Sequence, residues 1–218
     1  MNSTYPGEKG QYAGAVGLHP VRVEFPNVEY RNKLYAVPIA GILLKAIMLI
    51  PFIIAMYIVG FIVEIAGLVT WIPVLFVGKY PGFADTLYGG YVRWMSRIIT
   101  FMTGIQDKYP SFSFSDEVGS GDVSISWPFN ENPNKLWAIP FVGIFLKAVI
   151  CIPHLICLYV LGIVCGLIML VTWIPVITTG QYPQWGLTII GGTIRWQTRV
   201  FTFMYGIHDQ YPPFSLSA

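Results

Sequence analysis

Two long apolar stretches dominate the pattern of hydrophobic and polar positions along the chain. Residues 34–78 contain only two charged side chains, Lys45 and Glu64. Residues 136–180 contain only one, Lys147. An apolar run of about 18 residues or more is typical of a membrane-spanning helix. The composition agrees, with 55% hydrophobic and 11% charged residues. We therefore expect an all-α integral membrane protein.

The two stretches belong to an internal repeat with an offset of 102 residues and no gap. The sequence Trp-Ile-Pro-Val at 71–74 recurs at 173–176, and Arg-Trp at 93–94 recurs at 195–196. A fixed offset of this kind indicates a duplicated structural unit. We expect an irregular arm over residues 1–20, a first membrane repeat over 21–113, a linker over 114–122 and a second membrane repeat over 123–218.

Each apolar stretch is longer than one crossing of a bilayer requires. About 20 helical residues cross the hydrocarbon core, so each stretch supplies two crossings. We expect two like-oriented transmembrane helical hairpins, with tips near Gly60 and Gly162. The alternative for the first copy is a short interfacial helix over residues 38–50 followed by one long span over 52–77.

The placement of positive charge predicts an orientation. Of the 13 Lys and Arg residues, only Lys45 and Lys147 lie within the apolar stretches, so the hairpins would place all others on one face. Positive residues collect on the cytoplasmic side of a membrane. We therefore expect a multi-pass protein of the inner (cytoplasmic) membrane, with both termini and the repeat linker in the cytoplasm.

An amphipathic helix is expected after each apolar stretch, at about residues 83–105 and 185–207. Each carries two arginines four residues apart, on one helical face. Arginine is costly at the bilayer centre but favourable beside tryptophan at headgroup level. We predict interfacial helices whose contacts with lipid headgroups or a partner are made by Arg93, Trp94, Arg97, Arg195, Trp196 and Arg199. The alternative is a third span whose arginines turn into the protein interior.

Polar segments flank each unit. Residues 21–26 alternate as an edge strand does, and residues 123–128 repeat the pattern. Each copy closes with an acidic-aromatic turn, at 107–113 and 209–215. We expect the strand and the closing turn of each copy to form a small extended cap over its interfacial helix.

Four motifs follow one another in the second copy. They are Ile-Pro-His at 152–154, Trp-x-x-x-Ile-x-x-Gly-x-Tyr-Pro at 173–183, Arg-Trp-x-x-Arg at 195–199 and Asp-x-Tyr-Pro-Pro-Phe-Ser at 209–215. This order resembles a family of uncharacterised bacterial integral membrane proteins that is defined only as a domain of unknown function. The resemblance covers nearly the whole chain beyond residue 20. The first copy departs from it at Phe52, which replaces His, and at Ser111, which replaces the second Pro. The resemblance implies a membrane fold and no activity.

Candidate metal chemistry is confined to one cluster. Cys151, His154 and Cys157 lie three residues apart, which could place soft metal ligands on one helical face. The first copy has apolar residues at all three corresponding positions, so the repeated unit does not need them. We interpret the cluster as ordinary packing and expect no metal and no cofactor.

Four polar residues lie within the apolar stretches: Lys45, Lys147, Glu64 and His154. The two lysines occupy the same position in both copies, and an intramembrane lysine is a candidate functional site. Each could instead reach the interface or bond to backbone opened by the nearby proline. Since no Ser/His/Asp set, paired catalytic carboxylates or phosphate loop appears, we expect no catalytic residue and no enzyme.

Three functions agree with these features. The first is an accessory or scaffold subunit of a larger membrane complex, respiratory or photosynthetic, whose partners are membrane lipids and other membrane-protein subunits and not nucleic acid. The second is a membrane-shaping protein, in which two hairpins and their amphipathic helices wedge one leaflet. The third is a small-solute transporter or channel, which is weakened because few polar groups line any path.

Overall fold

The computed structural model describes residues 19–26, 30–116 and 121–217. The expected N-terminal arm lies almost entirely outside these residues, and the expected linker lies partly outside them. The first copy contains strand β1 (Arg22–Glu24), helix α1 (Lys33–Ala36), helix α2 (Ala40–Val77) and helix α3 (Gly82–Met102). The second copy repeats this order as strand β2 (Ser124–Ser126), 3-10 helix η1 (Lys135–Ala138), helix α4 (Val142–Thr179) and helix α5 (Gln184–Met204).

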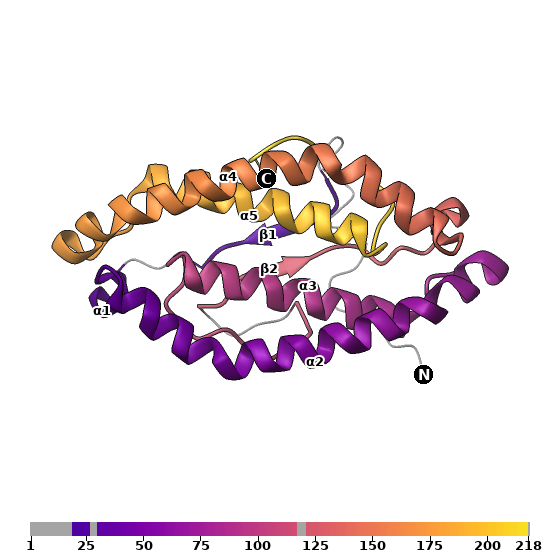
Figure 1. The fold of residues 1–218 in the computed structure, drawn as a ribbon, viewed down its shortest axis with the longest axis horizontal. Helices are drawn as coiled ribbons and strands as arrows, with labels where there is room; N and C mark the ends of the chain where they lie inside the picture. Colours follow the sequence, from indigo (N-terminus) through magenta and orange to yellow (C-terminus); the bar gives the residue numbers. More distant parts are fainter. Residues whose placement is uncertain (1–18, 27–29, 117–120, 218) are drawn as a thin grey trace.

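Each apolar stretch forms one continuous helix of 38 residues. The predicted hairpin is therefore wrong, because α2 runs through Gly60 and α4 through Gly162 without a turn. A glycine inside a helix costs only about 1 kcal/mol relative to alanine, and the neighbouring residues are good helix formers. The alternative break near residue 51 is also absent. Pro51 lies inside α2, and both long helices are bowed rather than broken (Figure 1).

A tight turn begins each long helix. Ile39 has φ 62°, and its counterpart Phe141 has φ 61°. In the first copy the next amide, Ala40 N, donates to Pro38 O at 2.6 Å, which is the hydrogen bond of a γ-turn. This sparsely populated backbone conformation occurs at the same place in both copies. It turns a bulky apolar side chain outward, so that Ile39 is 73% and Phe141 82% exposed.

The two copies are related by a pseudo-twofold rotation. Strands β1 and β2 pair antiparallel with Val23 opposite Ile125, its counterpart in the repeat. Helices α3 and α5 pack against each other at the centre, and α2 and α4 form the two outer arcs (Figure 1). A half-turn in the plane of Figure 1 exchanges α2 with α4, so the axis runs close to the direction of view. The long helices lie across this axis and antiparallel to each other.

At each end of the molecule, a segment of one copy contacts the end of the long helix of the other copy. Arg31 N donates to Gly180 O at 2.7 Å, which joins the residues before α1 to the end of α4. At the other end, η1 contacts α2, and Lys135 lies beside Gly78 at the end of that helix. The fold is consequently a single lens-shaped unit in which neither copy is complete without the other.

The polar caps exchange strands between the copies. Arg93 on α3 donates from Nε to Ile125 O at 2.9 Å, and Arg195 on α5 donates from Nε to Val23 O at 3.3 Å. Each strand therefore covers the amphipathic helix of the other copy, whereas we expected it to cover its own. The closing turn does cover its own helix, since Trp94 Nε1 donates to Ser113 O at 3.1 Å.

Helices α2 and α4 bury only a narrow stripe. In the most apolar window of each helix only 17% of the residues are buried. The exposed apolar side chains include Tyr57, Phe61, Leu68 and Phe76 on α2, and Phe145, Tyr159, Leu167 and Leu170 on α4. Soluble monomers rarely expose apolar patches larger than a few hundred Å². Both helices are long and apolar enough to cross a membrane.

Candidate functional site

The arginines of the first amphipathic helix lie beneath the cap. Arg97 is fully buried, and its guanidinium donates to Ser113 O and, at 2.8 Å, to Ser115 O. Its Nε lies 3.9 Å from an Asp122 carboxylate oxygen. Arg93 donates to Phe114 O at 2.8 Å. We predicted contacts with headgroups or a partner for these side chains, but their donors turn inward to backbone carbonyls and leave little guanidinium surface outside.

Burial has an electrostatic cost that the cap offsets. Desolvation lowers the pKa of Arg93 to about 10, while Asp116 and Asp85 oppose the shift. Arg93 therefore remains charged at neutral pH. Its guanidinium also lies 4.0 Å from the centre of the Trp127 ring, which contributes a cation–π interaction. These contacts fasten the cap to α3.

The second copy repeats the arrangement with different partners. Arg199 is buried and donates to Ser215 O at 3.4 Å and to Ser217 O. Arg195 is half-buried and lies 4.8 Å from the centre of the Phe25 ring. The arginine, tryptophan and closing-turn motifs thus act together, because the arginines and the tryptophan of each amphipathic helix hold the cap against that helix.

His154 is part of the same packing. Its Nδ1 accepts a hydrogen bond from Trp196 Nε1 at 2.9 Å, and its ring stacks on Phe214 at 3.8 Å. In the first copy Phe52 stacks on Phe112 at 4.4 Å in the corresponding place. Since His154 occupies the site of a phenylalanine, its geometry is that of an aromatic core residue. Among the described residues there is no group of three or more His, Cys, Asp or Glu side chains placed to hold a metal ion.

Both repeated lysines are buried at the C-terminal ends of the amphipathic helices. Lys45 Nζ donates to Phe101 O at 2.9 Å in the last turn of α3. Lys147 lies over the rings of Trp137 and Phe203, at 5.6 and 5.0 Å from their centres. A cation is favourable beside the exposed carbonyls of a helix end. The Lys45 ammonium group therefore donates to the backbone of α3. It does not donate to a carbonyl of its own helix that Pro51 would leave unpaired. Glu64, by contrast, is exposed on α2.

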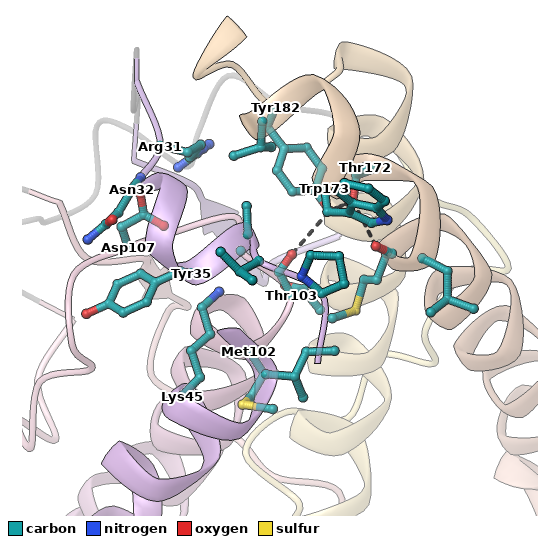
Figure 2. A pocket seen from close by; sticks show the side chains of 18 of the residues that line it. Arg31, Asn32, Tyr35, Lys45, Met102, Thr103, Asp107, Thr172, Trp173 and Tyr182 are labelled. Atoms are coloured by element: carbon teal, nitrogen blue, oxygen red, sulfur yellow. Dashed lines mark hydrogen bonds between the residues drawn. The ribbon is translucent and has the colours of Figure 1, made fainter. Parts of the chain in front are cut away.

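A cavity of about 140 Å³ lies beside Lys45, where the two copies meet (Figure 2). The start of the first copy supplies one wall, and the end of α4 with Tyr182 supplies the other. Tyr182 Oη donates to Thr103 O at 3.1 Å and so closes one side. The sequence did not reveal this cavity, because its wall residues are up to about 150 positions apart in the chain.

Three charged side chains line the cavity, those of Arg31, Lys45 and Asp107. Arg31 is buried and donates to Ile105 O, while its Nε has no hydrogen-bond partner. Burial lowers the pKa of Arg31, and Asp107 opposes that shift. Asp107 also accepts a hydrogen bond from Asn32 N at 2.5 Å. With Lys45, the wall carries two cations and one carboxylate, a net single positive charge.

The corresponding region at the other end of the lens differs at six of the lining positions, and two of these changes bear on charge and on the side wall. Pro133 replaces Arg31, so Lys147 and Asp209 balance each other there. Tyr205 replaces Thr103, and its ring contacts Tyr88 and Tyr91 with centres 6.2 and 5.8 Å apart. Tyr205 therefore packs a ring against α3 where the first copy has only a threonine. Among the described lining positions, the pair of cations is found at one end of a symmetric scaffold.

Comparison with known proteins agrees with the duplicated unit. Neither a curated protein nor a solved structure matches the chain. A family model described as a domain of unknown function (DUF4389) matches twice, over residues 40–114 and 142–215. Each match runs from the long apolar helix through the amphipathic helix to the closing turn. Because the two matches cover well over half of the chain, the protein belongs to the DUF4389 family and carries two tandem copies of its domain.

Proposed function

We propose that the protein lies within one leaflet of a membrane, with α2 and α4 parallel to the membrane plane, and that it shapes the membrane by widening that leaflet. The observation that carries this proposal is the position of the polar caps. They lie on the pseudo-twofold axis, at the middle of the length of the two apolar helices.

Helix length is the first argument. At 1.5 Å per residue a 38-residue helix is about 57 Å long, whereas the hydrocarbon core is about 30 Å thick. A crossing that kept the whole helix in hydrocarbon would need a tilt near 60°, well beyond the usual range of 0–40°. Apolar side chains are nevertheless exposed from Ile39 to Val77. A helix lying in the membrane plane keeps all of them in lipid.

The caps give a second argument. If α2 and α4 crossed the bilayer, the twofold axis would lie in the membrane plane. Strand β1, strand β2 and the closing turns would then stand at mid-depth, with polar backbone facing hydrocarbon. Unsatisfied polar groups in that environment cost several kcal/mol each. With the axis along the membrane normal, the caps face water.

The amphipathic helices agree with this orientation. On α3, Arg93 and Arg97 face the cap, while Tyr91, Met95 and Met102 lie on the opposite face and are partly exposed. The partly exposed face is apolar, as expected if it rests on acyl chains. The lens would therefore present one apolar face and one capped face, which is the form of a protein inserted from one side.

Both ends of each long helix, both caps and the described terminal segments then lie on the same side of the membrane. The positive-inside rule favours the cytoplasmic side of the inner membrane for that face. This proposal keeps the expectation that both termini are cytoplasmic, although no helix crosses the membrane in it. Insertion of four helices into one leaflet increases its area relative to the other, which bends the bilayer.

Reconstitution into liposomes of defined size tests the proposal. The purified protein should convert vesicles to tubules or smaller vesicles at high protein-to-lipid ratio. A matched variant, Phe61→Glu with Leu68→Glu, removes apolar contact at two exposed positions of α2 and should reduce this effect strongly. Vesicles that keep their shape at full protein insertion would overturn the shaping role.

A role as an accessory subunit is the second candidate. It is favoured by aromatic side chains exposed on the described cap segments: Phe112, Phe129, Tyr211 and Phe214. Exposed aromatic residues are enriched in protein interfaces. Extraction in mild detergent distinguishes the two roles, because a subunit should retain a stoichiometric membrane-protein partner through size exclusion.

A further inference from the structure

The residues that the structure describes around Lys45 leave the cavity with a net positive charge. Arg31 and Lys45 are buried and positive, and Asp107 supplies one negative charge. An uncompensated charge in a poorly solvated site is unfavourable, so a bound anion would stabilise the folded protein.

Within the part of the chain that the structure describes, both cations keep donors that could bind such an anion. Arg31 uses one terminal nitrogen for Ile105 O, and its buried Nε has no partner. Lys45 uses one of its three N–H groups for Phe101 O. A guanidinium with an adjacent ammonium is well suited to the oxygens of a phosphate group.

The rest of the wall is apolar and continues onto the outer surface. Ile39 and Ile42, at the start of α2, and Leu170 on α4 border the cavity and are exposed. A cavity of about 140 Å³ has room for a phosphate and its ester linkages. Hydrocarbon chains are too large for it and would lie on the neighbouring apolar surface.

We propose that this cavity is a binding site for the phosphodiester headgroup of one anionic phospholipid. Arg31 and Lys45 bind the phosphate oxygens, Tyr182 and Thr103 form the side wall, and the acyl chains lie against Ile39 and Leu170. We assign the site to this end of the lens, because Pro133 stands in place of Arg31 at the other end and the described lining positions there lack the second cation.

Lipid titration of the purified full-length protein in a non-ionic detergent tests this site. Native mass spectrometry should detect one phosphatidylglycerol per chain, bound at least tenfold more tightly than phosphatidylcholine. Arg31→Gln should weaken phosphatidylglycerol binding tenfold or more. Thr103→Tyr, which copies the other end of the lens and keeps both cations, should abolish it. Lys33→Gln removes an exposed cation of α1 and should leave binding unchanged.

The other outcomes overturn the proposal. Equal binding of the two lipids, or binding that both Arg31→Gln and Thr103→Tyr leave intact, would exclude a headgroup site in the cavity. Inorganic phosphate that binds as tightly as phosphatidylglycerol would show a site for free anions rather than for lipid. Thermal unfolding of each variant separates a loss of binding from a loss of fold. The assay needs no bilayer, so its result does not depend on the proposed one-leaflet insertion.

Discussion

Ser96 and Thr198, which occupy the same position in the two copies, share a hydrogen bond of 3.0 Å between their hydroxyl oxygens. Both side chains are buried at the contact of α3 with α5. Two equivalent residues can contact each other only on the twofold axis that relates their copies. Val23 and Ile125 mark the same axis in the strand pair. The chain is therefore built like a symmetric dimer whose two subunits have been joined.

The pair of hydroxyls on the axis gives the first prediction. A double-mutant cycle with Ser96→Ala and Thr198→Val should give a coupling energy of about 0.5–1.5 kcal/mol in unfolding experiments. The hydroxyls also bond to carbonyls of their own helices, so each single change should destabilise only modestly. Additive effects of the two changes would mean that α3 and α5 do not meet at these residues.

Glycine substitutions test the continuity of the long helices. Gly162→Ala should leave stability unchanged or raise it by up to about 1 kcal/mol, because nothing lies within 4 Å of the added methyl group and alanine favours a helix. Gly143→Ala is the contrasting variant, since its Cβ would lie 2.1 Å from Trp137 O. It should destabilise the protein by more than 2 kcal/mol. A turn at Gly162 would reverse the first result, and thermal unfolding in detergent measures both.

Arg97 tests the role of the capped arginines. Arg97→Lys should lower the free energy of unfolding by about 3 kcal/mol, because a lysine cannot reach the carbonyls of Ser113 and Ser115 together. Lys79→Gln, at an exposed cation between α2 and α3, should change it by less than about 0.5 kcal/mol. If Arg97 instead contacted headgroups, lysine would replace it at little cost and vesicle binding would change rather than stability.

The lowered pKa values of His208 and His19 predict that the protein loses stability in mild acid. Burial, with His19 and Lys147 nearby, lowers the pKa of His208 to about 3, and burial lowers that of His19 to about 4. The unfolded chain takes up protons at these histidines near pH 6.5 and the folded chain does not, so stability falls as the pH drops from 6.5 towards 4. At pH 5 each histidine should lower the free energy of unfolding by about 2 kcal/mol relative to pH 7.

The variant His208→Gln carries the residue that the first copy has at this position, Gln106. It should be less sensitive to the change from pH 7 to pH 5 by about 2 kcal/mol. Chemical or thermal unfolding at the two pH values measures the difference. An unchanged pH dependence would place the acid-sensitive group elsewhere.

The repeat, the apolar stretches and the amphipathic helices could all be predicted from the sequence, because each leaves a local periodic pattern. The single long helix could not. Gly60 lies where a hairpin tip would be expected, but it is a helical residue of α2 with Tyr91 of α3 beside it. Length was the available signal, but it fits two crossings as well as one long helix in the membrane plane.

The site was the least predictable part. The repeat marks Lys45, because both copies retain it, but it does not mark Arg31, whose counterpart is Pro133. Their proximity depends on the exchange of segments between the copies, which no local pattern records. The sequence pattern singles out Arg93 and Arg97, but their burial under a cap depends on segments that lie up to about 30 positions away.

A depth profile along α2 tests the central claim most directly. Single nitroxide labels at four exposed positions, Ile42, Ile54, Phe61 and Phe76, can be measured in bilayers by accessibility to oxygen and to a water-soluble nickel complex. A helix in the membrane plane should give a similar depth at all four sites, with no site accessible from the far side of the vesicle. A steady change in depth from Ile42 to Phe76, passing through the bilayer centre and emerging on the far side, would contradict the account.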